Sequence, residues 1–70
     1  MDTLTEKKKA ALYSEAAKMI LLNRNNLAIK RMLAAFQKQL VEADTTKEIT
    51  NMQIVFTSLK YLLEITYTNK

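Results

Sequence analysis

The stretch MQIVFTSLKYLLEITY, residues 52–67, decides the fold because its length favours a helix. β-Branched residues near its start would suit a strand, but the apolar residues do not alternate strictly and no turn signal divides the stretch. Large apolar side chains occur on nearly every side of this helix, whereas a helix in a simple hairpin needs only one apolar side. Residues 52–67 must therefore bury a second face against something else.

The composition indicates a small all-α domain that has neither disulfide bonds nor the common metal sites to stabilise it. Its 70 residues include no glycine, proline, cysteine or histidine. Sheets use glycine and proline at their turns, so we expect residues 1–70 to form a single helical domain. Below roughly 80 residues a single core rarely provides more than about 3–5 kcal/mol. With disulfides and the common zinc sites excluded, a partner chain is the remaining source of stability.

Two capping boxes and a heptad pattern predict an antiparallel, coiled-coil-like helical hairpin. Thr3 with Glu6 and Thr45 with Glu48 fit the Ser/Thr-x-x-Glu pattern that begins helices. Residues 42–45 are then the turn between helices 26–42 and 46–67, and apolar residues recur at heptad spacing on both sides of it. The seam is Leu12, Glu15, Met19, Leu22, Asn26, Ile29, Leu33, Phe36, Leu40 and Ala43 before the turn, and Ile49, Met52, Phe56, Leu59, Leu63 and Thr66 after it.

The segment NRNN, residues 23–26, interrupts the first seam. Asparagine side chains compete for backbone hydrogen bonds and favour caps and turns over helix interiors. Either one helix runs from about residue 4 to residue 42, or the chain breaks here and residues 4–22 form a third helix. The asparagines favour the break.

Two apolar stripes lie outside the predicted seam, and we expect them to bind a partner. The last helix places apolar residues at positions that should face solvent, and the N-terminal segment has a second stripe beside its seam. Residues 4–22 could fold back over the second face of the last helix and close a three-helix bundle. Alternatively, a partner chain could cover this face, and both could cover parts of it at once. The residues concerned are Ile54, Val55, Tyr61, Leu62 and Ile65, with Tyr13, Ile20 and Leu21 in the N-terminal segment.

Catalysis and cofactor binding find no support in the sequence. Without histidine or cysteine, the usual parts of nucleophilic and metal-assisted catalysis are missing, so we expect no enzyme, no cofactor and no small-molecule ligand. Arg24, Arg31 and Lys38 form a basic stripe in a segment without acidic residues. A solvated helix face explains this stripe, and a small nucleic-acid-binding or regulatory protein is the alternative. No segment approaches the ~18 apolar residues of a membrane span, and we expect a cytoplasmic protein.

The segment LAIKRMLAAFQKQLVEADTTKEITNMQIVFTSLKYLLEI, residues 27–65, resembles the small co-chaperones of type III secretion needle subunits, the YscE/PscE/EscE type. The likeness covers about residues 27–67 and consists of a basic amphipathic helix, a short polar turn and a final helix rich in apolar residues. The turn departs from the family because it contains no glycine. Needle subunits are also small hairpins, but they have a proline-containing turn that this chain lacks.

The resemblance implies a cytoplasmic heterodimer with a chaperone built from TPR-like helical repeats. Through that chaperone, the pair would keep the needle subunit soluble and unpolymerised before secretion. In such a complex the small protein stabilises the repeat protein. Independently of the resemblance, a chain that depends on a partner is expected to be marginally folded or to self-associate when the partner is absent. Stacked repeats need capped ends, and the second apolar face of the last helix would suit that purpose.

Overall fold

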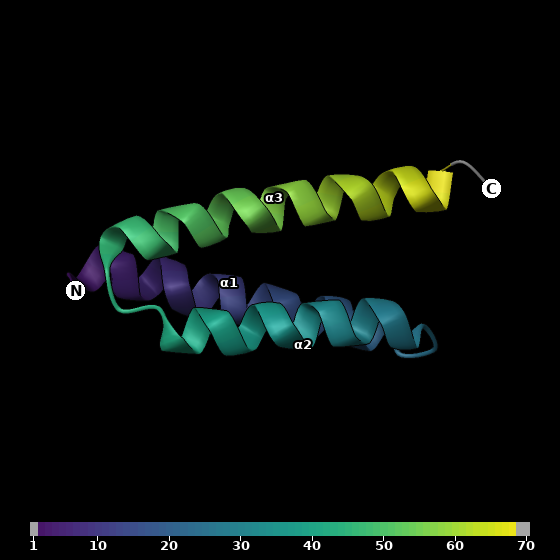
Figure 1. Cartoon of the computed structure of the whole chain (residues 1–70), viewed down its shortest axis with the longest axis horizontal. Helices are drawn as coiled ribbons and strands as arrows, with labels where there is room; N and C mark the ends of the chain where they lie inside the picture. Colours follow the sequence, from purple (N-terminus) through teal and green to yellow (C-terminus); the bar gives the residue numbers. More distant parts are fainter. Residues whose placement is uncertain (1, 69–70) are drawn as a thin grey trace.

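The computed structural model describes residues 2–68, with side chains up to residue 64, as three antiparallel helices. They are α1 (Thr3–Leu22), α2 (Leu27–Glu42) and α3 (Thr46–Thr68). α2 and α3 form the predicted hairpin, and α1 lies behind them in the view of Figure 1, in contact with both. The all-α prediction is confirmed, and no strand occurs among the residues that the structure describes.

The asparagines of the NRNN segment end one helix and begin the next. Asn23 is the C-cap of α1, and its Nδ2 donates to the Met19 carbonyl at 2.7 Å. Asn26 is the N-cap of α2, and its side-chain oxygen accepts the Ile29 amide at 3.2 Å. The predicted break is therefore confirmed, and the alternative of one continuous helix is wrong. Asn26 marks this boundary at the surface instead of occupying a buried seam position.

The two predicted capping boxes have different outcomes. Thr45 caps α3 as expected, because its hydroxyl accepts the Glu48 amide at 3.1 Å and donates to the Glu48 carboxylate at 3.0 Å. The capping box predicted at Thr3 is wrong, since Asp2 is the N-cap of α1 and Thr3 is already helical. The Asp2 carboxylate accepts the Thr5 amide at 2.7 Å, which leaves no need for the hydroxyl of Thr3.

The Asp2 cap predicts a pH-dependent contribution to stability. Its hydrogen bonds from Thr5, the backbone amide first, hold the pKa of Asp2 below its ordinary value of 3.8. A group whose pKa is lower in the folded state stabilises that state above its unfolded pKa, and the effect is lost as the pH falls through the folded pKa. Asp2→Ala should therefore lower the melting temperature at about pH 6, and this difference should narrow towards about pH 2. A difference that does not change with pH would show that the carboxylate charge plays no part.

The core lies along the axis where the three helices meet, and it matches the predicted seam closely in α2 and α3. At its centre the Phe36 and Phe56 rings stack with centroids 5.0 Å apart. Met52 is partly buried against this core, and the side chain of Thr66 lies outside the described residues. The buried apolar residues are Leu12, Ala16, Ile29, Leu33, Phe36, Leu40, Ala43, Ile49, Phe56, Leu59 and Leu63.

In α1 the predicted seam is wrong at two positions. Glu15 and Leu22 are exposed, and Ala16, one residue after Glu15, is fully buried. α1 packs against two helices, so its buried side is centred between them and is rotated away from a seam drawn for a single partner. The small side chain of Ala16 lets the three helices approach closely, and Leu22 is left at the rim as the chain turns.

Polar contacts fasten α1 to the turn between α2 and α3. The Lys9 ammonium donates to the carbonyls of Val41 and Ala43 at 3.1 and 2.7 Å, and so satisfies acceptors at the end of α2 that have no helical partner. The hydroxyls of Thr5 and Thr46 lie 3.3 Å apart. Ala43 leaves α2 in an extended conformation, φ −70° and ψ 127°, so this turn needs no glycine.

Candidate protein-binding face

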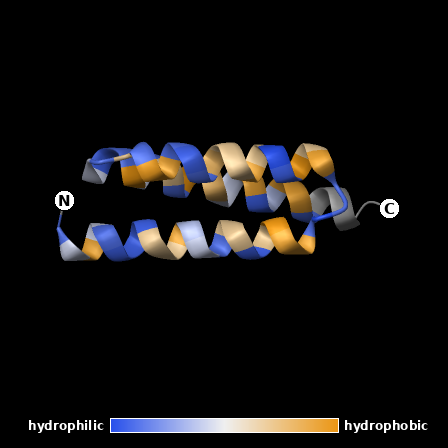
Figure 2. Ribbon diagram, turned by 90° about the horizontal axis from the view of Figure 1, so that it is seen from below, coloured by the Kyte–Doolittle hydropathy of each residue, from blue (hydrophilic) through white to orange (hydrophobic). Residues whose placement is uncertain are grey.

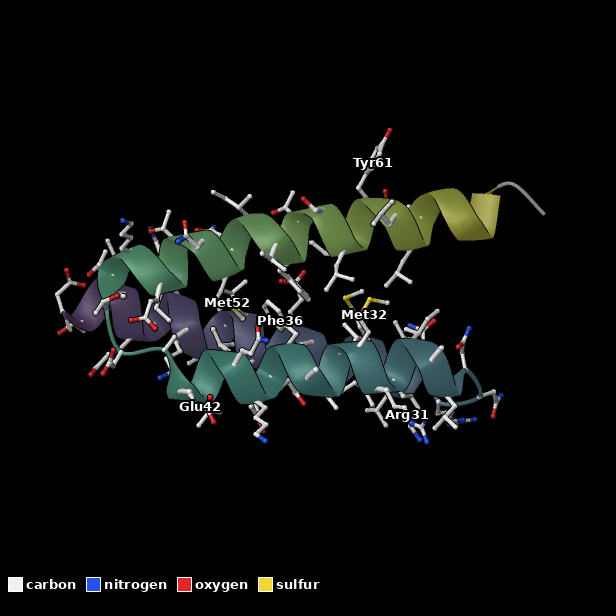
Figure 3. All side chains as sticks on the ribbon, viewed as in Figure 1. Arg31, Met32, Phe36, Glu42, Met52 and Tyr61 are labelled. Atoms are coloured by element: carbon white, nitrogen blue, oxygen red, sulfur yellow. The ribbon has the colours of Figure 1, made fainter. Side chains whose placement is uncertain are left out.

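Four large apolar side chains on one side of α3 stay exposed after the bundle has closed. Ile54, Val55, Tyr61 and Leu62, hereafter the α3 strip, are 61, 48, 64 and 59% exposed. α1 does fold back to complete a three-helix bundle, but it packs against the buried side of the hairpin. The internal cover proposed for the second face of α3 is therefore wrong. Tyr61 points away from the other helices in Figure 3.

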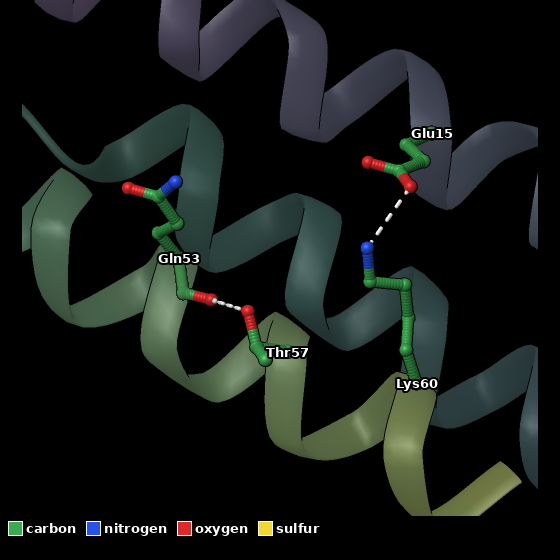
Figure 4. Close-up of polar contacts among 4 residues, drawn as sticks. All are labelled: Glu15, Gln53, Thr57 and Lys60. Atoms are coloured by element: carbon green, nitrogen blue, oxygen red, sulfur yellow. Dashed lines mark hydrogen bonds and ion pairs between the residues drawn. The ribbon is translucent and has the colours of Figure 1, made fainter. Parts of the chain in front are cut away.

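No charged side chain interrupts the middle of this strip. Residues 49–59 are all uncharged. Lys60 turns to the other side of α3, where its ammonium lies 3.1 Å from the Glu15 carboxylate (Figure 4) and 5.2 Å from the centre of the Phe56 ring. Beside the strip, the Thr57 hydroxyl donates to the Gln53 carbonyl at 3.0 Å. The strip is therefore uncharged, and two flanking hydroxyl groups, those of Thr50 and Thr57, donate their hydrogens to backbone carbonyls within α3.

A groove between α2 and α3 continues the α3 strip on one side. Its volume is about 280 Å³. Met32 lies at its edge, facing α3 from α2 (Figure 3), and is 45% exposed. The flexible thioether of methionine adapts well to a partner surface. Met32 was not among the predicted binding residues, because only α3 and the N-terminal segment have a surplus of apolar residues in the sequence. The groove is lined by Met32, Ala35, Phe36, Gln39, Val55 and Leu59.

A shallow hollow lies on the other side of the α3 strip. It has a volume of about 330 Å³ and is formed entirely by α3. Four of its residues follow the spacing i, i+3, i+4, i+7, which is the pattern that receives a side chain from a second helix in coiled coils. The residues lining the hollow are Thr50, Gln53, Ile54, Thr57 and Ser58.

The structure separates the other predicted binding residues from this face. Tyr13 borders Val41 of α2 in a depression between α1 and α2, and Ile20 is partly buried against the core. Leu21 lies at the end of α1, where hydrophobic residues gather in Figure 2. The side chain of Ile65 lies outside the described residues. Tyr13, Ile20 and Leu21 therefore lie in three different surroundings. Among the predicted binding residues with described side chains, those of α3 share one surface.

A second groove, of about 450 Å³, lies between α1 and α3 near the α1–α2 turn. Met19, Leu22 and Leu63 give it apolar walls, and the Lys60–Glu15 ion pair lies at its edge. The buried Asn23 Oδ1 has no hydrogen-bond partner within the described part of the chain. That atom has almost no exposed surface, so a molecule in the groove would not reach it without a rearrangement.

The predicted basic stripe is divided between α2, which carries Arg31 and Lys38, and the turn before it, which carries Arg24. Arg24, Arg31 and Lys38 are exposed, and Arg31 points away from α3 in Figure 3. No acid belongs to the segment that carries these three cations. The molecule therefore has an uncharged apolar surface on α3 and a basic surface on α2 and the turn before it.

Within the described residues, no helix combines the length and the apolar character that crossing a membrane requires. The same residues hold no group of three or more acidic side chains placed to ligate a metal ion. Comparison with protein-family models, curated proteins and solved structures finds no match to this chain.

Proposed function

We propose that this chain is a small cytoplasmic co-chaperone that binds a helical-repeat protein through the α3 strip. The observation that carries the proposal is the exposure of four large apolar side chains on one side of α3 after all three helices have packed. Burying such side chains contributes about 1.5–3 kcal/mol each, which is large for a domain of this size. Cores of protein interfaces are depleted in charge, as residues 49–59 are.

A helical-repeat partner suits the shape of this surface. The end of a repeat array needs a polar cap, and a last repeat without one exposes the apolar side that a neighbouring repeat would otherwise cover. A straight helix with side chains at i, i+1, i+7 and i+8 can lie along such a repeat, as amphipathic helices do in apolar grooves. The resemblance of residues 27–65 to needle co-chaperones suggests a TPR-like chaperone, with the type III secretion needle subunit held by that chaperone.

The test is capture from the cytosol of the source cells with a tag on the N-terminus, followed by affinity measurement with the purified partner. We expect a helical-repeat protein to be retained in stoichiometric amount at moderate salt. Leu62→Ala should weaken the complex at least about tenfold, or about 1.4 kcal/mol, because an apolar side chain at the interface centre is lost. The helical signal in circular dichroism should stay unchanged.

Leu4→Ala is the matched control, since Leu4 is exposed to a similar degree but lies at the start of α1. Equal losses from the two variants would contradict a specific role for the α3 strip. Retention of nucleic acid, lost when Arg24, Arg31 and Lys38 become glutamine, would favour the nucleic-acid-binding alternative.

A further inference from the structure

We propose that the depression between α1 and α2 binds an amphipathic helix of another protein, one whose apolar residues are flanked by carboxylates. A preformed depression, a row of apolar residues along α2 and the cations beside that row point to this occupant. The site is separate from the α3 strip, so it does not rest on the proposed function.

The depression is preformed by contacts between α1 and α2. Its volume is about 420 Å³, and Tyr13 and Val41 on its two sides are 44 and 60% exposed. The Gln37 side chain donates to the Tyr13 carbonyl at 3.2 Å, and the Lys9 ammonium donates to the Val41 carbonyl at 3.1 Å. These contacts hold the two helices together, so a partner meets a preorganised surface. The depression is lined by Glu6, Lys9, Ala10, Tyr13 and Val41.

A row of apolar residues continues the depression along α2. Leu27, Ala34 and Val41 are exposed and lie seven residues apart, which is about 10.5 Å along the helix. Residues at this spacing share one side of a helix, because the direction of the side chain drifts by only about 20° for each heptad. The small Ala34 lets a second helix lie close between the larger Leu27 and Val41. A helix with apolar residues at heptad spacing matches this row, and one of its large side chains enters the depression beside Val41.

Cations beside the row select the partner by charge. Arg31 and Lys38 are exposed and precede Ala34 and Val41 by three residues, so each cation lies next to its apolar neighbour on α2. Arg24 adds a positive charge in the turn before α2. In paired helices, charges beside the apolar row form ion pairs that set partner choice and orientation. The partner helix therefore carries aspartate or glutamate beside its own apolar row.

The charge distribution also sets where the partner's carboxylates lie. Glu6 and Glu42 are at the end of the α1–α2 pair that adjoins the α2–α3 turn, whereas residues 16–41 contain no acid. Carboxylates of the partner are repelled at that end and attracted towards Arg31 and the α1–α2 turn.

An acidic helix fits this surface better than the other anionic partners do. Phosphates of a nucleic acid would pair with the cations, but they would leave the apolar row uncovered. Surfaces that bind an anionic bilayer insert large apolar side chains into it, whereas this row has an alanine at its middle and a depression at one end. A helix side chain fills that depression, and carboxylates on the same helix reach Arg31 and Lys38.

Two designed peptides of about four heptads each test the charge selection. Both have leucine at positions a and d, and they differ in having glutamate or lysine at positions e and g. Fluorescence anisotropy of each labelled peptide, titrated with the full chain at low salt, gives its dissociation constant. We expect the glutamate peptide to bind at least about tenfold more tightly than the lysine peptide. The difference should shrink as added salt screens the ion pairs.

The double variant Arg31→Glu, Lys38→Glu should reverse this preference. The control Lys8→Glu, Lys47→Glu makes the same change of net charge at two exposed residues outside the row, and it should keep the preference. Circular dichroism verifies that both variants are folded.

Equal binding of the two peptides by the parent chain, or equal effects of the two double variants, would overturn the proposal. Binding of phosphatidylglycerol vesicles or of a DNA duplex, with neither peptide bound, would overturn it as well. None of these results affects capture of a helical-repeat protein and its loss in Leu62→Ala, which test the proposed function separately.

Discussion

Replacement of Phe56 by alanine should leave the chain largely unfolded at 25 °C. Phe56 is only 1% exposed and stacks on Phe36 at the centre of the bundle. Phe→Ala changes in protein cores cost about 3–5 kcal/mol, and a core of this size rarely provides more than about 3–5 kcal/mol in total. The expected result is a weak helical signal in circular dichroism and no cooperative thermal transition.

Tyr61→Ala is the control for this loss, because it also removes an aromatic ring from α3 but at a largely exposed position. Surface substitutions usually change stability by less than about 0.5 kcal/mol. Urea titration of the two variants and the parent chain would separate the effects. A Phe56→Ala variant with the parent's midpoint would contradict the packing of the two rings at the core.

The double variant Asn23→Ala, Asn26→Ala should join α1 and α2 into one continuous helix. The two caps contribute about 1 kcal/mol each, and alanine has the highest helix propensity. The substitutions therefore destabilise the turn and favour the continuous helix at the same positions. Residues 3–42 would then form a rod about 60 Å long, whereas the bundle is 42 Å along its longest axis.

Small-angle X-ray scattering measures this change directly as an increase in the largest dimension. α1 would leave the hairpin, so Leu12 and Ala16 would lose their core contacts. Asn25→Ala is the control, since Asn25 is exposed in the same turn and caps neither helix. An unchanged largest dimension in the double variant would show that packing of α1, and not the asparagines, sets the position of the break.

The hairpin could be predicted from the sequence because its signals are local. The Thr45–Glu48 pair begins α3, and two apolar stripes at heptad spacing meet across a short turn. The side of α1 that would be buried could not be predicted in the same way. A heptad drawn for one neighbouring helix selects Glu15, but α1 has two neighbours and buries Ala16. That rotation depends on where α1 lies in the bundle.

The α3 residues of the candidate site could be named in advance because they occupy positions that a hairpin leaves outside its seam. Met32 could not be named from the sequence. It lies on the side of α2, and whether such a residue lines a groove depends on the spacing between α2 and α3. The division of Tyr13, Ile20 and Leu21 among different surroundings likewise depends on the rotation of α1. Residues at helical spacing share one face of a helix, but which of them stay exposed depends on how the helices pack together.

The contacts of Lys9 and of Thr5 with the α2–α3 turn make the two ends of the bundle unequal. One end joins the start of α1 to the chain reversal through three polar contacts between distant residues. Towards the other end, the ion pair of Glu15 and Lys60 links α1 to α3 through exposed side chains. The start of α1 is therefore held against the α2–α3 turn, and this end of the bundle should separate last. A binding partner that draws α3 outward would open the core progressively from the far end, while the first turns of α1 and α3 stay together.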